Sequence, residues 1–240
     1  MTRVLTLNLN FDEAKHGPWP ARLPHVAAAV TRLQPDVIAL QAVRRRAGGL
    51  DQVEAIASAT GLTHRYFVAA RGDDTVEDGS AILARLPIVA RDCTRLTYDP
   101  NPEDAATRIL LQATLDLGRG RRLTVANGHF SWVAALNARN VDETLKSLAK
   151  IDGDAVLVGD FNATPDAPGM RAIATAGWRD AWHALHGEDD GATFEAPSPT
   201  LRIDYVWLRG ELKAKRIERV SAPAGAAARL SDHFGLFVEI

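Results

Sequence analysis

Four short segments place polar side chains where an apolar, strand-like run ends or begins. The first segment, Val156–Pro165, delivers Asp160 and Asn162 two residues apart, so in extended geometry both side chains point to the same side. A carboxylate beside an amide can orient a water molecule and hydrogen-bond a negatively charged oxygen. The same spacing is typical of an Asx turn that closes a strand. This segment alone therefore does not decide between a catalytic and a structural role.

The other three segments each carry a histidine, an acid or both. His129 follows the apolar run 123–126, Asp204 opens another apolar run, and Asp232 directly precedes His233. Taken singly, these residues also fit a structural histidine, a capping acid and a surface turn. Adjacent side chains of a strand point to opposite faces. One of the two side chains can then bind a metal while the other contacts a substrate.

Hydrophobic periodicity predicts strands and helices that alternate along the whole chain. Val4–Asn10 alternates strictly, as a half-buried strand does, and Arg22–Gln34 has the spacing of an amphipathic helix. The other predicted strands are 37–40, 66–69, 80–84, 88–96, 108–117, 121–127, 155–158, 204–208, 212–220 and 234–240, and the other predicted helices are 51–60 and 134–150. Hairpin-like pairs interleaved with helices favour a mixed α/β layered sandwich, in a single domain over residues 1–240.

The composition is that of an ordinary globular protein. Of 240 residues, 46% are hydrophobic and 24% are charged, which excludes a disordered chain, a collagen and a coiled coil. One cysteine excludes an internal disulfide framework, and no apolar run reaches the roughly 18 residues of a membrane span. No signal peptide precedes the first strand, so we expect a cytoplasmic protein and a monomer. The net charge of −2 argues against a protein that coats nucleic acid.

The joint occurrence and order of the polar segments resemble the endonuclease/exonuclease/phosphatase superfamily. The matching residues are Asn8, Gln41, Asn127-Gly128-His129, Gly159-Asp160-Phe161-Asn162, Arg202-Ile203-Asp204-Tyr205 and Ser231-Asp232-His233. The resemblance implies a four-layer α/β sandwich, with two packed mixed β-sheets flanked by helices. It also implies phosphoester hydrolysis by direct attack of water on phosphorus, with Mg²⁺ or Mn²⁺ as cofactor. The substrate would be a nucleic acid, a nucleotide or another phosphodiester.

The resemblance further implies a role for individual residues. Asp160 would orient or deprotonate the attacking water, and Asn162 would hold a phosphate oxygen. His233 would hydrogen-bond the phosphate, with Asp204 as its partner acid. His129 would be a second phosphate contact or a proton donor.

Position 42 departs from the family pattern. The family strand ends in Leu-Gln-Glu, whose glutamate is the principal metal ligand, whereas this chain reads Leu40-Gln41-Ala42. Alanine offers no oxygen to Mg²⁺. Asn8 and Asp232 match metal-site positions of the family, and Asn10 and Gln41 are further candidate ligands.

Three interpretations of the alanine are open: a natural subgroup that holds its metal otherwise, an engineered inactive variant, and a catalytically lapsed relative. The main hypothesis is a metal-dependent phosphoester hydrolase, either a nuclease or a small-molecule phosphatase. The alternative is a non-catalytic relative that binds phosphate ligands. A secreted toxin or lipase of the same fold is disfavoured, because the chain lacks a signal peptide and a cysteine pair.

Substrate contacts are expected in the loops. Trp132 could stack on a base or cover a sugar, and Arg139, in the predicted helix that follows, could face a phosphate. Loop 11–20 and the aromatic residues Trp178, Trp182 and Phe194 are further candidates. For each aromatic residue, packing over a loop is the structural alternative, and a solvated arginine is the alternative for Arg139.

Overall fold

The computed structural model describes residues 1–10, 17–99, 103–104, 106–189, 191–223, 225–226 and 228–240. Within them, two mixed six-stranded sheets pack face to face, with five helices around them. The first sheet consists of β1 (Arg3–Asn8), β2 (Val37–Arg46), β3 (His64–Gly72), β4 (Val76–Ala84), β11 (Arg216–Val220) and β12 (Gly235–Glu239). Its strand order is β11-β12-β1-β2-β4-β3.

The second sheet is built in the same way. It consists of β5 (Ile88–Arg95), β6 (Ile109–Asp116), β7 (Arg122–His129), β8 (Ala155–Asp160), β9 (Arg179–Asp180) and β10 (Asp204–Arg209), in the order β5-β6-β7-β8-β10-β9. One parallel pair lies inside each sheet, β1–β2 in the first and β7–β8 in the second. The carboxyl ends of both parallel pairs carry residues of the polar segments.

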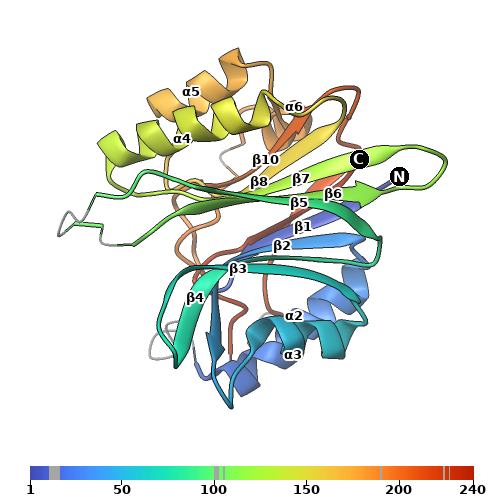
Figure 1. Ribbon diagram of the computed structural model, residues 1–240, viewed down its shortest axis with the longest axis vertical. Helices are drawn as coiled ribbons and strands as arrows, with labels where there is room; N and C mark the ends of the chain where they lie inside the picture. Colours follow the sequence, from blue (N-terminus) through green and yellow to red (C-terminus); the bar gives the residue numbers. More distant parts are fainter. Residues whose placement is uncertain (11–16, 100–102, 105, 190, 224, 227) are drawn as a thin grey trace.

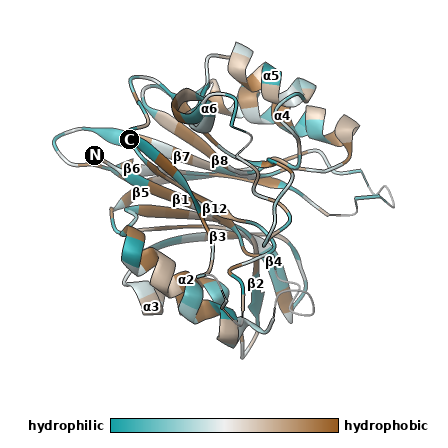
Figure 2. Cartoon of the chain, turned by 180° about the vertical axis from the view of Figure 1, so that it is seen from behind, coloured by the Kyte–Doolittle hydropathy of each residue, from teal (hydrophilic) through white to brown (hydrophobic). Residues whose placement is uncertain are grey.

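Helices cover the outer face of each sheet. In Figure 1, α2 (Trp19–Leu33) and α3 (Gln52–Thr60) lie below the first sheet, and α4 (Ala134–Leu148) and α5 (Pro168–Thr175) lie above the second. A buried apolar cluster with Val37, Val125 and Val158 joins the two sheets, and one further cluster lies under each helix pair. Figure 2 shows hydrophobic residues along the strands of both sheets. The prediction of a four-layer α/β sandwich is confirmed, and the prediction of a single domain stays a prediction.

The structure differs from the predicted elements after β8. Neither α5 nor α6 (Ala181–His186) was predicted, because both are too short for a clear helical period. Trp182 lies in α6 instead of a loop, and both Trp178 and Trp182 are buried in apolar clusters. The predicted substrate loop falls partly on residues 11–16, which lie outside the described residues. Among the described helices, none has the length and the apolar character that a membrane crossing needs.

Glycine at position 159 lets β7 and β8 approach closely. Gly128 faces Gly159 in the parallel register, and His129 then faces Asp160. A Cβ atom on Gly159 would lie 1.9 Å from the carbonyl oxygen of Gly128, and the φ of Gly159 is +134°. Both observations require glycine here. The glycine of the Gly-Asp-Phe-Asn segment therefore holds the acid against the histidine.

We expect Gly159→Ala to lower the free energy of unfolding by about 3 kcal/mol or more, since the new methyl group meets backbone atoms. Gly153→Ala is the matched control, because Gly153 has a φ of +83° but a Cβ atom added there would have no other atom within 4 Å. That control should cost only about 1 kcal/mol. Urea denaturation measures both values, and equal losses would show that the two strands separate easily.

Candidate active site

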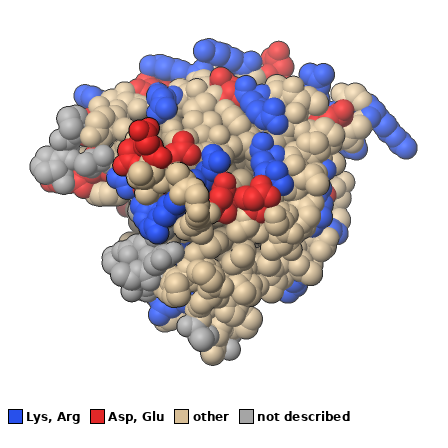
Figure 3. Space-filling model, turned by 60° about the horizontal axis from the view of Figure 1, so that its bottom comes forward, with Lys and Arg blue, Asp and Glu red and all other residues tan. Residues whose placement is uncertain are grey.

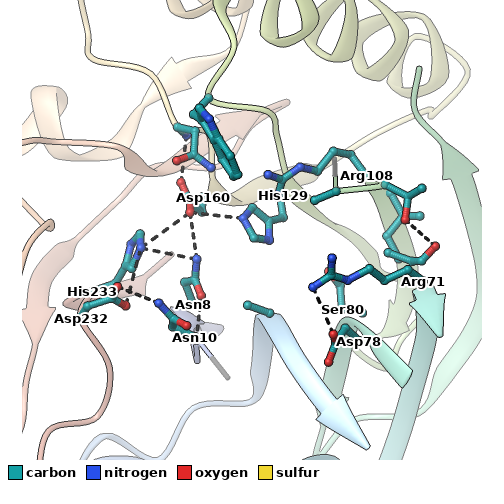
Figure 4. A pocket seen from close by; sticks show the side chains of 18 of the residues that line it. Asn8, Asn10, Arg71, Asp78, Ser80, Arg108, His129, Asp160, Asp232 and His233 are labelled. Atoms are coloured by element: carbon teal, nitrogen blue, oxygen red, sulfur yellow. Dashed lines mark hydrogen bonds and ion pairs between the residues drawn. The ribbon is translucent and has the colours of Figure 1, made fainter. Parts of the chain in front are cut away.

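A pocket of about 500 Å³ opens where the ends of the two sheets meet. Asn8 ends β1, His129 ends β7 and Asp160 ends β8, and all three line the pocket. Asp232 and His233, in the segment before β12, line the same wall. In Figure 4 these side chains point toward one another. Residues more than 220 positions apart in the sequence thus share one site.

The register of the second sheet places the acids and the histidine in one row. His129 on β7 faces Asp160 on β8, and Asp160 faces Asp204 on the antiparallel strand β10. Asp204 is buried and does not line the pocket, because His233 lies between it and the pocket space.

Asp160 is at the centre of the polar contacts. Its Oδ2 accepts a hydrogen bond of 2.9 Å from Nδ2 of Asn8, and the Nε2 atoms of His129 and His233 lie 3.5 and 3.8 Å from the same oxygen. Its Oδ1 accepts the backbone N–H of Asn162 at 2.9 Å. The Asx turn that the sequence suggested as a structural role for this segment therefore forms. The same turn fixes the carboxylate of Asp160, which lines the pocket.

The predicted pair of Asp204 and His233 is in direct contact. Nδ1 of His233 lies 2.8 Å from Oδ2 of Asp204. Burial alone would lower the pKa of His233, but the negative charges of Asp204 and Asp160 and the hydrogen bond that His233 donates to Asp204 raise this pKa to about 10. His233 is therefore an imidazolium at neutral pH, with Nε2 directed at Asp160.

The other two titratable groups of this wall are shifted as well. Burial and the positive charges of Arg108 and His233 hold the pKa of His129 well below its usual range, so His129 is neutral. Burial raises the pKa of Asp160 to about 6 against the opposing charge of His233. A charged and a neutral histidine on either side of one carboxyl group can serve as donor and acceptor of protons at neutral pH.

The wall near Asn8 has the donor chemistry of a site for a hard divalent cation. Asn8, Asn10, Asp160 and Asp232 all line the pocket and carry side-chain oxygens, and such oxygens suit Mg²⁺ or Mn²⁺. Three carboxylates surround the single imidazolium of His233 within 4.0 Å. This excess of negative charge favours a cation. The residues present therefore fit a divalent metal.

Position 42 lies at the pocket and contributes no ligand atom. Ala42 lines the pocket at an irregularity in the pairing of β2 with β4, between Leu40 and Val43. Its φ is +49°, and three of the five described non-glycine residues with positive φ, namely Asn10, Ala42 and Asn162, line this pocket. Strained backbone collects at functional sites. The position that the resemblance matches to a metal-binding glutamate thus lies at the pocket, within β2 and not at the end of this strand.

The structure brings most of the predicted site residues together. The residues that line the pocket are Asn8, Asn10, His129, Trp132, Asp160, Asn162, Asp232 and His233. Gln41 does not line it: the side chain is fully buried and donates to Thr6 and Asn127, while its Oε1 has no hydrogen-bond partner among the described residues. Arg139 is exposed on α4 and lies outside the pocket lining. Roles for Gln41 and Arg139 stay predictions.

Asp232 and His233 do not behave as neighbours on a strand. They precede β12, and His233 forms an isolated bridge with Phe194, so both side chains reach the same pocket instead of opposite faces. The ring of Phe194 lies 4.9 Å from the ring of His233. Of the aromatic residues proposed as substrate contacts in the later loops, Phe194 is thus the one at the pocket.

Sequence reasoning missed the opposite wall of the pocket. Arg71, Asp78, Ser80 and Arg108 line it. Arg108 directly precedes β6, so a polar residue at a strand end was the available signal. Arg71 and Asp78 flank a tight connection between β3 and β4, and nothing in their spacing distinguishes them from surface charges.

Comparison with known proteins assigns the family. The sequence model of the Endonuclease/Exonuclease/phosphatase family matches residues 5–233, so the chain belongs to this family. A search of curated proteins found no match.

Solved structures share the fold over the whole chain. A family member from Bacteroides vulgatus is 20% identical, with a TM-score of 0.83 and coverage of 99% of this chain and 97% of that one. A mannosyl-6-phosphatase from Bacteroides thetaiotaomicron is 22% identical, with a TM-score of 0.79 and coverage of 100% and 99%. TDP2 from D. rerio, complexed with a single-strand DNA product, is 16% identical, with a TM-score of 0.73 and coverage of 99% and 97%. At these identities the likeness concerns the fold.

We expect Asp204→Asn to lower the pKa of His233 from about 10 toward the ordinary histidine value near 6.5, because the carboxylate that stabilises the imidazolium is lost. Nitrogen-15 NMR of the imidazole during a pH titration measures this pKa. Asp142→Asn, on the exposed side of α4, is the control and should leave it unchanged. An unaltered His233 pKa in Asp204→Asn would contradict the pairing.

Proposed function

We propose that this protein is a divalent-metal-dependent hydrolase of small phosphoesters, in which water attacks phosphorus directly. The observation that carries the proposal is the position of Asp160, held between a neutral His129 and a charged His233 in one pocket. Family membership supports phosphoester chemistry. A buried carboxyl group with a raised pKa, facing a pocket between two histidines, is typical of a catalytic acid or base.

Asp160 is the proposed base for the attacking water. Hydrogen bonds from Asn8 and from the backbone of Asn162 fix the carboxylate, and a pKa of about 6 suits proton transfer at neutral pH. His233 presents Nε2 to the pocket while Asp204 holds Nδ1, so it can donate a hydrogen bond to a phosphoryl oxygen. Neutral His129 can accept or relay a proton on the other side of Asp160. Asn162 lines the pocket beside them and is the proposed phosphate contact.

The metal would be held by Asn8, Asn10 and Asp232. Nδ2 of Asn10 donates to Oδ2 of Asp232 at 2.7 Å, and the backbone N–H of Asn10 donates to Oδ1 of Asn8 at 2.9 Å, so these three residues already form one connected group. When bound, the cation would polarise the phosphoryl group and neutralise its charge. Because Ala42 adds no oxygen, Mg²⁺, which demands near-ideal octahedral oxygen ligation, would be held less well than Mn²⁺.

The pocket favours a small substrate over a long nucleic acid. A volume of about 500 Å³ is in the range of small-molecule sites. On the face in Figure 3, basic and acidic side chains are interspersed, whereas a nucleic-acid track needs basic residues gathered together. The neighbours include both a phosphatase and a DNA complex, so they support phosphoester chemistry without selecting between the two. Trp132, 55% exposed at the pocket, is placed to cover a sugar or a base.

The experiment that tests the proposal is a panel of phosphomonoesters and phosphodiesters, assayed with Mg²⁺, Mn²⁺ or no metal. We expect hydrolysis of small phosphoesters that EDTA abolishes and Mn²⁺ supports better than Mg²⁺. Phosphate release without any metal, or no turnover of any substrate by the natural chain and by Ala42→Glu, would contradict it. A cytoplasmic location and a monomeric state rest on the sequence alone and stay predictions.

Ala42→Glu should raise Mg²⁺-dependent hydrolysis by about tenfold or more, because it returns an anionic oxygen to the metal side of the pocket. Ala42→Gln is the matched control: it has nearly the same size but no charge, and should gain far less. Paired steady-state kinetics, with each metal titrated, measure the effect. Strong Mg²⁺-dependent turnover by the natural chain would contradict the expectation and direct attention to Asn10 and Gln41 as replacement ligands.

A further inference from the structure

The pocket has a second polar wall whose residues have no direct contact with the substrate in the proposed hydrolysis. Arg71, from the end of β3, and Arg108, just before β6, lie across the pocket from Asn8 and His233 in Figure 4. Asp78 and Ser80 of β4 lie beside Arg71 on this side. A pocket with a reactive wall and a separate basic wall can hold a substrate at two places.

Arg108 carries a buried donor without an acceptor. Its side chain is only 5% exposed, and its Nη2 donates to both carboxylate oxygens of Asp104 at 3.2 and 3.1 Å. Its Nε has no hydrogen-bond partner among the described residues. A buried donor left unpaired is costly, and native proteins rarely keep one without a reason. Because Arg108 also lines the pocket, its guanidinium group has spare hydrogen-bonding capacity at the pocket wall.

A hydrogen bond joins the two chain segments that carry the arginines. Oγ1 of Thr107 donates to the carbonyl oxygen of Ala70 at 2.7 Å, and these residues directly precede Arg108 and Arg71. Arg71 lies near the end of a strand of the first sheet, and Arg108 precedes a strand of the second. The hydrogen bond thus fixes the origins of both side chains against each other at the pocket wall.

Asp78 on this wall is shared by two arginines. Arg71 contacts Asp78 at 3.3 Å, and the same carboxylate accepts two hydrogen bonds from Arg44, at 2.7 and 2.9 Å. Asp104 pairs with Arg108. Planar guanidinium groups have several N–H donors and suit phosphate oxygens.

We propose that Arg71 and Arg108 form a second anion subsite, which binds a phosphate group of the substrate other than the one that is hydrolysed. The preferred substrates are then small phosphoesters with a second phosphate near the scissile one. This inference rests on the proposed function for the reaction itself, but the subsite also binds without turnover. Trp132, whose ring lies 5.2 Å from the Arg108 guanidinium carbon, covers this arginine from the solvent side.

Binding without metal tests the subsite apart from catalysis. Calorimetry in EDTA compares inorganic phosphate, which fills one subsite, with pyrophosphate, which has a second phosphate group. We expect the natural chain to bind pyrophosphate about tenfold or more tightly than phosphate. Arg71→Ala should weaken pyrophosphate binding and remove most of that difference. Arg71→Lys should retain only part of it, because lysine cannot donate in a planar fork.

Two controls keep the result interpretable. Arg121→Ala removes an exposed arginine in the turn between β6 and β7, at the opposite end of β7 from His129, and should change neither affinity. Arg108→Gln, checked for folding by circular dichroism, should weaken pyrophosphate binding as Arg71→Ala does; if it does not fold, the Arg71 variants decide alone. Equal affinities for the two anions, or equal losses in Arg71→Ala and Arg121→Ala, would overturn the subsite. Failure of the hydrolase proposal would appear separately, as absence of turnover in the metal-dependent assays.

Discussion

The hydrogen bond between Asn8 and Asp160 is the contact on which the site depends. Asn8 ends a central strand of one sheet and Asp160 ends a central strand of the other, and their side chains meet at 2.9 Å. Each sheet alone carries only part of the polar residues that form the site. The sandwich packs the two parallel strand pairs so that their carboxyl ends face a common pocket, and open α/β sheets place ligands at such strand ends.

The charges around Asp160 explain the protonation states of the two histidines beside it. Asp160, Asp204 and Asp232 surround His233, and together they keep it an imidazolium despite its burial. Arg108 and His233 in turn keep His129 neutral, so the two histidines differ in charge only through their surroundings. The remaining negative charge suits a divalent cation beside Asn8 and Asp232. In the proposed metal site, Ala42 would offer the cation no ligand atom.

The residues around Asp160 could be predicted from the sequence, whereas those of the opposite pocket wall could not. Asp160 and His129 follow apolar strands, and strand ends can be read from hydrophobic patterns. The resemblance already placed Asp232 and His233 in one site, but strand alternation wrongly predicted opposite faces for them, because a local bridge between His233 and Phe194 sets the backbone there. Arg71 and Arg108 were missed since their proximity comes from contacts between the two sheets. The short helices after β8 were missed because Asp180 caps the second of them locally, in a stretch with little periodicity.

The most direct test of the account is the rate of phosphoester hydrolysis by Asp160→Asn, made in the natural chain and in Ala42→Glu and assayed with saturating Mn²⁺. The substitution keeps the size of the side chain but removes the proton acceptor. The account predicts a fall in kcat of about 100-fold or more, with the free energy of unfolding nearly unchanged and phosphate still bound. Turnover by Asp160→Asn within a few-fold of its parent would contradict the account, because the base would then be another group.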